Sequence, residues 1–395
     1  MTNKLPIGWT LKRLGDITER ITRKNTINNN NVLTISAEHG FISQDKFFTK
    51  IVASKDLSKY ILLYKGDFCY NKSYCRGYPY GVFRKLKNYD VGVATSLYIY
   101  FKIIEGDSTF FEYLFDVGTL NKQLSIISQE GVRNHGLLNV PIEDFFNMTV
   151  PFPPIDEQKR IAEVLSLCDK LIENLTKLIE KKEIYKKGVM QRVLTGEVRF
   201  NGFTDEWETM PLCKILEERK TFQPKDGNLE HVSLTKEGVV PKSERYERDF
   251  LVKDKNKQYK ITKINDICYN PANLKFGVIC KNNYGEGIFS PIYVTFEVNK
   301  GFNIDFISYI LKSESFINNA RRYEEGTVYE RKAVSPENLL SIKIKIPPSI
   351  EEQNKIAELL TLIDKDIEIL KRLLHLRKLQ KKGVMQKLLT GEVRI

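Results

Sequence analysis

The closest approach to a catalytic motif in this sequence is the phrase Asn270-Pro271-Ala272-Asn273. An amino-methyltransferase acting on DNA would need Asn-Pro-Pro followed by an aromatic residue, and this phrase lacks both the second proline and the aromatic residue. The corresponding phrase in the first half of the chain, residues 71–74, has no proline at all. We therefore interpret the segment as a turn of the scaffold.

Other catalytic patterns are also missing from the sequence. There is no GxxxxGK[ST] phosphate loop, no GxGxxG after a strand, and no GxSxG or HExxH motif. The six cysteines form no CxxC pair and there are only four histidines, which argues against a zinc site and favours free, buried thiols in a reducing compartment. The sequence therefore assigns no catalytic residue and no metal ligand.

Composition points to an anionic partner. The formal net charge is +12 and the pI is near 9.1, which is typical of proteins that bind nucleic acid but is not specific to them. The N-terminus has no apolar segment of a signal peptide, and no run of eighteen apolar residues occurs. We expect a cytoplasmic protein.

The elements that would position any functional side chain are set by an internal repeat. Residues 155–200 return as residues 350–395 without a gap, with 26 of 46 positions identical. The blocks before each copy share anchors at matching spacing, such as GDFCYN at 66–71 and NDICYN at 265–270. Short β-type runs with one or two helices in each block predict two mixed α/β domains built on one scaffold.

Each repeated stretch is predicted to be a long helix. Apolar residues recur at alternating steps of four and three, a heptad seam, and a second apolar row that includes Val164 and Leu171 widens the stripe enough to contact more than one neighbour. Gly188 and Gly383 are expected to end or bend the helices, so a helix over 156–187 would be about 48 Å long. The seam comprises Ile161, Leu165, Ile172, Leu175, Ile356, Leu360, Ile367 and Leu370.

Two matching seams in one chain favour antiparallel packing of the helices on each other, since each block enters its helix through the same Pro-rich phrase. The alternative is two independent amphipathic helices that each cover their own domain. Ser349 with Glu352 also fits a capping box at the start of the second helix.

Three phrases carry a resemblance to a known family. They are PIGW at 6–9, the EQxxIA phrase that begins each helix at Glu157 and Glu352, and KKGVMQxxLTGEVR at the end of each copy. With the order block, helix, block, helix, the whole chain resembles the specificity subunit of type I restriction-modification enzymes.

The resemblance implies an α+β fold in which two target recognition domains are separated by two long antiparallel helices that form a coiled-coil spacer, with internal pseudo-two-fold symmetry. Its boundaries would be 1–152 and 201–347 for the recognition domains, and 153–200 and 348–395 for the helices. Each domain would read one half of a bipartite site in double-stranded DNA, and the helices would set the gap and dock two methyltransferase subunits. Restriction subunits would join them. S-adenosylmethionine, ATP and Mg would be bound by those partners and none by this chain, which would be non-catalytic within an adenine-N6 methyltransferase complex.

In that setting, polar loops that differ between the blocks are the expected DNA readers, because Arg pairs with guanine and Asn with adenine in the major groove. For each of them the alternative is a solvated loop. Trp9 and Trp207 are instead expected to anchor the core of each domain. The candidate DNA-binding residues are Lys72, Tyr74, Arg76, Arg133, Asn134, His135, Asn273, Lys275, Arg321, Tyr329, Arg331 and Lys332.

Two other classes of protein compete with this interpretation. A stand-alone DNA methyltransferase or nuclease would need the cofactor and phosphate motifs that the sequence lacks. A coiled-coil adaptor that binds only proteins would not need two domains of about 150 residues with divergent polar loops.

Overall fold

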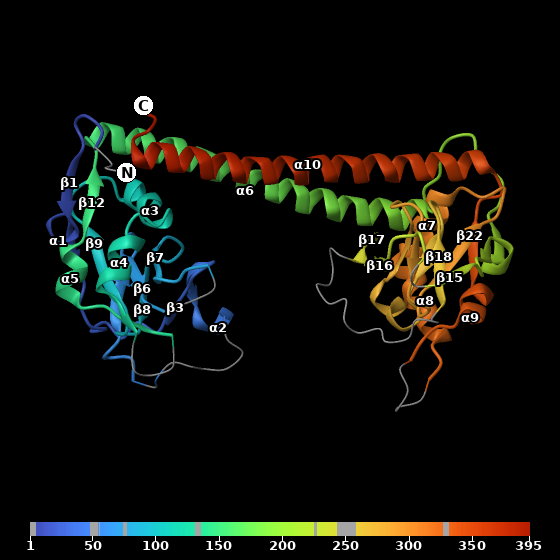
Figure 1. The fold of residues 1–395 in the computed structure, drawn as a ribbon, viewed down its shortest axis with the longest axis horizontal. Helices are drawn as coiled ribbons and strands as arrows, with labels where there is room; N and C mark the ends of the chain where they lie inside the picture. Colours follow the sequence, from blue (N-terminus) through green and yellow to red (C-terminus); the bar gives the residue numbers. More distant parts are fainter. Residues whose placement is uncertain are drawn as a thin grey trace. The chain divides into compact units, whose positions relative to one another are not determined.

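The computed structural model describes residues 5–47, 54, 56–73, 77–130, 136–224, 227–242, 258–326 and 332–395. By its contacts the chain divides into two compact units: unit 1 comprises Met1–Thr176 and Leu373–Ile395, and unit 2 comprises Lys177–Arg372. Each unit holds one mixed domain together with one end of each long helix (Figure 1). This division follows contacts and cuts both helices, whereas the boundaries expected from the sequence follow the repeat, so those boundaries stay a prediction.

Unit 1 is organised around a four-stranded antiparallel sheet in the order β2-β9-β6-β7. The inner strand β6 reads FCYN and is buried along its whole length, which suits its aromatic and small apolar residues. Two-stranded pairs β1-β12, β3-β4, β5-β8 and β10-β11 complete the domain. The elements are β1 (Thr10–Arg13), α1 (Leu14–Ile17), β2 (Thr18–Arg20), β3 (Leu33–Ser36), β4 (Gly40–Ser43), α2 (Gln44–Phe47), β5 (Ile61–Tyr64), β6 (Phe68–Asn71), β7 (Val82–Lys85), β8 (Val91–Ala94), β9 (Ile99–Ile103), α3 (Ser108–Asp116), α4 (Asn121–Ile127), β10 (Gln129–Glu130), β11 (Leu138–Asn139), α5 (Ile142–Asn147) and β12 (Thr149–Phe152).

Unit 2 repeats this topology. Its central sheet has the order β14-β22-β19-β20, and β13 pairs with β23 as β1 pairs with β12. A three-stranded sheet β15-β18-β21 and the pair β16-β17 lie outside the central sheet. The elements are β13 (Glu208–Pro211), η1 (Leu212–Lys214), β14 (Leu216–Glu218), β15 (Phe222–Pro224), β16 (Val232–Leu234), β17 (Val239–Pro241), β18 (Gln258–Thr262), β19 (Ile267–Tyr269), η4 (Pro271–Phe276), β20 (Ile279–Lys281), β21 (Gly287–Phe289), β22 (Val294–Val298), α7 (Ile304–Lys312), α8 (Glu314–Ala320), η5 (Arg321–Tyr323), α9 (Pro336–Ser341) and β23 (Lys343–Ile346).

The two tryptophans are core residues, as the sequence predicts. Trp9 is 6% exposed and belongs to the buried cluster of unit 1, and Trp207 is 8% exposed in the cluster of unit 2. The unit 1 cluster is rich in packed aromatic rings, for example Phe83 against Phe115 with centroids 4.7 Å apart. Each domain thus has an apolar core of its own.

The long helices are α6 (Ile155–Val193) and α10 (Ile350–Thr390). Both run through Gly188 and Gly383, which were expected to end or bend them, so the predicted helix ends are wrong. Gly188 and Gly383 have ordinary helical backbone and nothing near the position of a missing Cβ, and one glycine costs only about 1 kcal/mol in a helix interior. The left-handed glycines that follow the helices are Gly196 and Gly391, with φ of 75° and 69°.

Within each unit the start of one long helix lies beside the end of the other, which confirms the antiparallel prediction. In unit 2, Lys182 and Lys186 of α6 pair with Asp366 and Asp364 of α10 at 2.6 and 2.5 Å. In unit 1, Lys381 of α10 pairs with Asp169 of α6 at 2.5 Å. The α+β fold class with two mixed domains and two antiparallel helices is confirmed.

The predicted seam is only partly a helix-to-helix contact. Ile161 and Leu165 are fully buried in the domain core of unit 1, while Ile356 and Leu360 are equally buried in that of unit 2. Ile367 is buried, and Ile172, Leu175 and Leu370 are half-buried. The first turns of each helix therefore cover their own domain, and of the later seam positions Ile367 is the most buried.

The second apolar row, which is completed by Leu178, Leu359, Leu373 and Leu376, behaves as predicted only in part. Leu359 and Leu373 are half-buried, and Leu359 packs against the core of unit 2. Val164, Leu171, Leu178 and Leu376 are 37%, 47%, 40% and 60% exposed, so the described residues leave these four side chains partly uncovered.

Candidate nucleic-acid interface

The two loops of unit 1 that were expected to read DNA are joined at their bases. The Leu138 amide donates to the Lys72 carbonyl oxygen at 2.9 Å, and Ser73 forms a β-bridge with Leu137. Lys72 is half-buried where the first loop begins. The other candidates of this unit, Tyr74, Arg76, Arg133, Asn134 and His135, lie outside the described residues.

Unit 2 joins its corresponding loops in the same way. The Val334 amide donates to the Pro271 carbonyl at 3.2 Å, and the Tyr269 hydroxyl donates to the Val334 carbonyl at 3.1 Å. Lys332 is exposed close to this junction. Tyr329 and Arg331 lie outside the described residues. In both units, therefore, tertiary structure brings together two loop segments that are more than fifty residues apart in the sequence.

A buried asparagine holds the start of the first loop in each unit. Asn71 and Asn270 are each 7% exposed, and their side-chain oxygens accept the amides of Ser73 and Ala272 at 2.9 and 3.1 Å. Both therefore form turns that satisfy backbone donors. Their role in holding the turn agrees with the scaffold interpretation of the Asn-Pro phrase.

The remaining candidates of unit 2 share one surface. Asn273 and Lys275 belong to η4, and the Arg321 guanidinium at the start of η5 donates to the Lys275 carbonyl at 3.0 Å. Phe276 is 56% exposed beside them, and Gly277 closes the turn with a φ of 79°. The structure thus gathers cationic, amide and aromatic groups, which are the groups that contact phosphates and bases.

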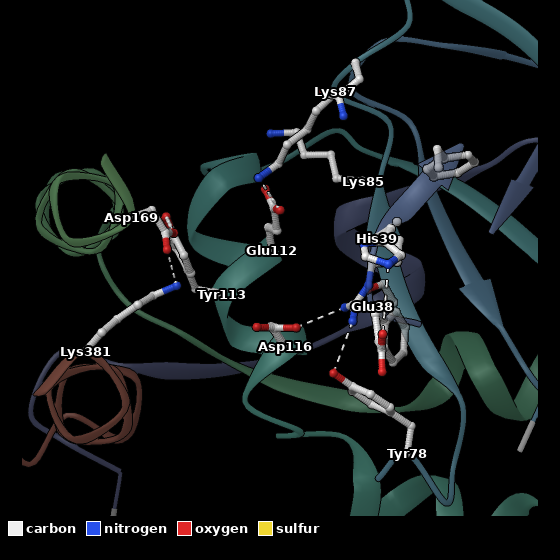
Figure 2. Close-up of a pocket in the computed structure, with 15 residues that line it drawn as sticks. Glu38, His39, Tyr78, Lys85, Lys87, Glu112, Tyr113, Asp116, Asp169 and Lys381 are labelled. Atoms are coloured by element: carbon white, nitrogen blue, oxygen red, sulfur yellow. Dashed lines mark hydrogen bonds and ion pairs between the residues drawn. The ribbon is translucent and has the colours of Figure 1, made fainter. Parts of the chain in front are cut away.

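Two further clusters escaped sequence reasoning. In unit 1 the Tyr113 hydroxyl donates to Asp169 at 2.7 Å, and Lys381 pairs with the same carboxylate (Figure 2). Burial raises the pKa of Tyr113, and the bond to Asp169 adds to the rise. Tyr309, Asp364 and Lys186 repeat this arrangement in unit 2. The sequence did hold a signal for this cluster, because the Tyr, Asp and Lys residues occupy matching positions in the two halves of the chain.

The second cluster consists of ion pairs between the EQ phrase at the start of each long helix and the GEVR phrase at the end of each repeat copy. Arg394, after α10, binds Glu157 at the start of α6, and the Trp9 indole donates to the same carboxylate at 3.1 Å. In unit 2, Arg199 makes a bidentate contact with Glu352 at 2.8 and 2.7 Å. Glu352 therefore does not complete a capping box, although Ser349 does accept its amide at 3.3 Å. The end of each repeat copy is fixed to the start of the other.

Within the part of the chain that the structure describes, no group of three or more His, Cys, Asp or Glu residues is placed to hold a metal ion. Among the same residues, no helix combines the length and apolar character that a bilayer crossing needs.

Comparison with known proteins gives one consistent result. Residues 6–183 and 205–376 each match the family model of the type I restriction modification DNA specificity domain. The chain is 29% identical over 281 residues to the type I restriction enzyme MjaVIII specificity subunit of Methanocaldococcus jannaschii, covering 66% of this chain and 65% of that protein. It is 28% identical over 282 residues to the putative MjaX specificity subunit of the same organism, covering 63% and 60%. The match thus spans just under two thirds of these relatives.

Solved structures show the same fold. The type I restriction-modification S subunit from M. genitalium superimposes with a TM-score of 0.54 at 15% identity, covering 98% of this chain and 99% of that chain. The HsdS subunit from Thermoanaerobacter tengcongensis gives 0.51 at 17% identity, covering 99% of both chains. At this level of identity the likeness concerns the fold alone.

Proposed function

Because this chain belongs to the type I restriction modification DNA specificity family, we propose that it is the DNA-recognition subunit of such an enzyme. One observation carries the proposal: the family model matches twice, once over each mixed domain, and the two domains share a topology. Each domain would then read its own half of a bipartite sequence in double-stranded DNA. A stand-alone enzyme and a purely protein-binding adaptor are both less consistent with this family.

We propose the paired loops as the readers. In unit 1 these are the segments that begin at Lys72 and end before Leu138, and in unit 2 they are η4 and the segment that ends at Lys332. Their bases are fixed by the scaffold, so their side chains can differ between the domains without changing the fold. The candidates Arg133 and Arg331 occupy corresponding loops.

The long helices are proposed to dock two methyltransferase subunits, and restriction subunits would complete the enzyme. Exposed leucines on the helices, Leu171 and Leu376 in unit 1 and Leu178 in unit 2, support a protein partner, because the described chain leaves these side chains uncovered. We further propose that S-adenosylmethionine, ATP and Mg²⁺ belong to those partners, that this subunit performs no adenine-N6 chemistry itself, and that the complex works in the cytoplasm.

The helices are also proposed to set the number of unread base pairs. The 39 residues of α6 correspond to about 58 Å of helix, against about 34–36 Å for one turn of B-DNA. Insertion of one helical turn in both α6 and α10 should lengthen the gap in the methylated motif. A motif with an unchanged gap would refute this role.

The proposal is tested by co-expressing the chain with its methyltransferase partner and sequencing methylated adenines in the host DNA. The expected result is a bipartite motif with a fixed gap. Arg133→Ala should relax one half of the motif and cost about 1–3 kcal/mol in binding that half, while the other half is unchanged. Methylation that is absent, or that follows a continuous motif without a gap, would contradict the proposal.

A further inference from the structure

Unit 2 contains a large basic pocket beside the candidate DNA-reading surface. It has a volume of about 810 Å³ and is lined by the last turns of α6, by η4 and by the start of α8. A second hollow, of about 410 Å³, shares Lys236 and Phe276 with it and reaches Asn270 and Asn273. The pocket is therefore continuous with the surface on which the predicted readers of unit 2 lie.

The charge of this pocket is strongly unbalanced. Five cationic side chains line it against a single carboxylate, Glu314, which pairs with Lys187 at 3.1 Å. Among the described residues, the other four make no ion pair. They are Lys236, Lys275, Lys312 and Arg321. Four cations that converge without carboxylate partners repel one another, so a bound polyanion would stabilise them.

The pocket also offers apolar surface. Met190, Leu194 and Ile317 contribute to its lining, and the exposed ring of Phe276 lies with its centroid 5.4 Å from the Lys275 ammonium. An aromatic ring next to lysines suits a nucleotide, because a sugar or an unstacked base can pack on the ring while the phosphate meets the cations.

A pocket of unit 1 shows that a lining rich in Lys and Arg need not carry such an excess. It lies by the β3–β4 turn, α3 and β7, and its four Lys and Arg side chains are matched by four carboxylates (Figure 2). Arg84 pairs with Asp116 at 2.9 Å and Lys87 with Glu112 at 2.5 Å. The two pockets have one matched position, the end of the nine-residue helices α3 and α7, where unit 1 has Asp116 and unit 2 has Lys312.

We propose that the basic pocket of unit 2 holds backbone phosphates of bound DNA, whereas the charge-balanced pocket of unit 1 does not. This inference rests on the proposed function, since it names the DNA backbone as the occupant. Phosphates carry no sequence information, so the pocket would raise affinity and leave the recognised motif unchanged.

The test is the salt dependence of DNA binding by the chain assembled with its methyltransferase partner. Lys236 and Lys312 are replaced together by Gln. Lys275 is kept because it belongs to η4, a proposed reader, and Arg321 is kept because it bonds the backbone of η4. Loss of two phosphate contacts should reduce the slope of log Kd against log salt by about two. Between 50 and 200 mM salt the wild type should therefore lose about 12-fold more affinity than the variant.

A matched control removes the same charge elsewhere in unit 2. Lys300 and Lys343 are exposed and lie outside the pocket, and their joint replacement by Gln should leave the slope close to that of the wild type. The methylated motif should be the same in all three proteins.

Several results would overturn the inference. An unchanged slope in the pocket variant, with the motif still methylated, would refute phosphate binding by the pocket and leave the proposed function intact. An equal change in the control would mean that net charge and not the pocket is responsible. Loss of the methyltransferase partner from the pocket variant would assign the pocket to an acidic protein surface. A wild-type complex that methylates no bipartite motif would refute the proposed function as well.

Discussion

Replacement of Leu165 by Ala measures how firmly α6 is fixed to the domain of unit 1. Leu165 is fully buried and belongs to the same core cluster as Trp9, Phe110 and Leu388. Alanine has the highest intrinsic helix propensity, so the substitution does not weaken α6 as a helix. Any loss of stability therefore reports the packing of the helix on the domain.

The expected magnitude follows from burial. A Leu→Ala change at a fully buried position costs about 2–5 kcal/mol, because transfer free energy is lost and a cavity remains. For a unit of about 200 residues, 1 kcal/mol corresponds to about 2–4 °C in Tm. We expect the melting transition of unit 1 to fall by roughly 4–20 °C.

Thermal unfolding followed by circular dichroism checks this value, with Leu167→Ala as the matched control. Leu167 is two residues away on the same helix but 58% exposed, so its replacement should change stability by no more than about 0.5 kcal/mol. If Leu165→Ala costs less than about 1 kcal/mol, or no more than the control, the helix is not packed on the domain as described.

Three further changes test other features. Gly391→Ala should lower Tm, because φ is 69° and a Cβ there would overlap the Pro6 ring. Gly188→Ala should raise stability by up to about 1 kcal/mol, because Gly188 is helical and has open space where its Cβ would lie. A stabilising Gly391→Ala together with a destabilising Gly188→Ala would contradict the backbone conformations described for these two glycines. Arg394→Gln should lower Tm, because the Glu157 carboxylate, which is 4% exposed, loses its charged partner. An unaltered melting curve would show that the Arg394–Glu157 ion pair does not stabilise the fold. Burial raises the Tyr113 pKa above 10.0, so the folded state keeps a proton that the unfolded state releases, and stability should fall as pH rises through 10; Tyr113→Phe should flatten this decline in an alkaline unfolding series.

Much of the fold could be predicted from local patterns. The matching anchor phrases at 66–71 and 265–270 contain β6 and β19, which are corresponding strands of the two central sheets. The resemblance of the repeated phrases predicted the family directly.

The candidate site could be predicted only in part. Asn273, Lys275 and Arg321 were chosen separately and do lie on one surface, while the loop residues 74–76, 131–135 and 327–331 remain outside the described structure. The basic pocket was missed because its lysines come from distant segments, and Lys236 and Lys312 look like ordinary solvated residues in the sequence.

The sequence by itself determined the duplication, the helical period and the shared scaffold, because these depend on residue types at fixed local spacing. Only the tertiary structure decided that the start of each repeat copy pairs with the end of the other copy. Glu157 pairs with Arg394, and Glu352 pairs with Arg199. It also decided that Gly188 stays helical and that Leu171 stays exposed. The physical reason is that a periodic pattern fixes which residues are apolar or charged, whereas their partners depend on which segments pack together in space.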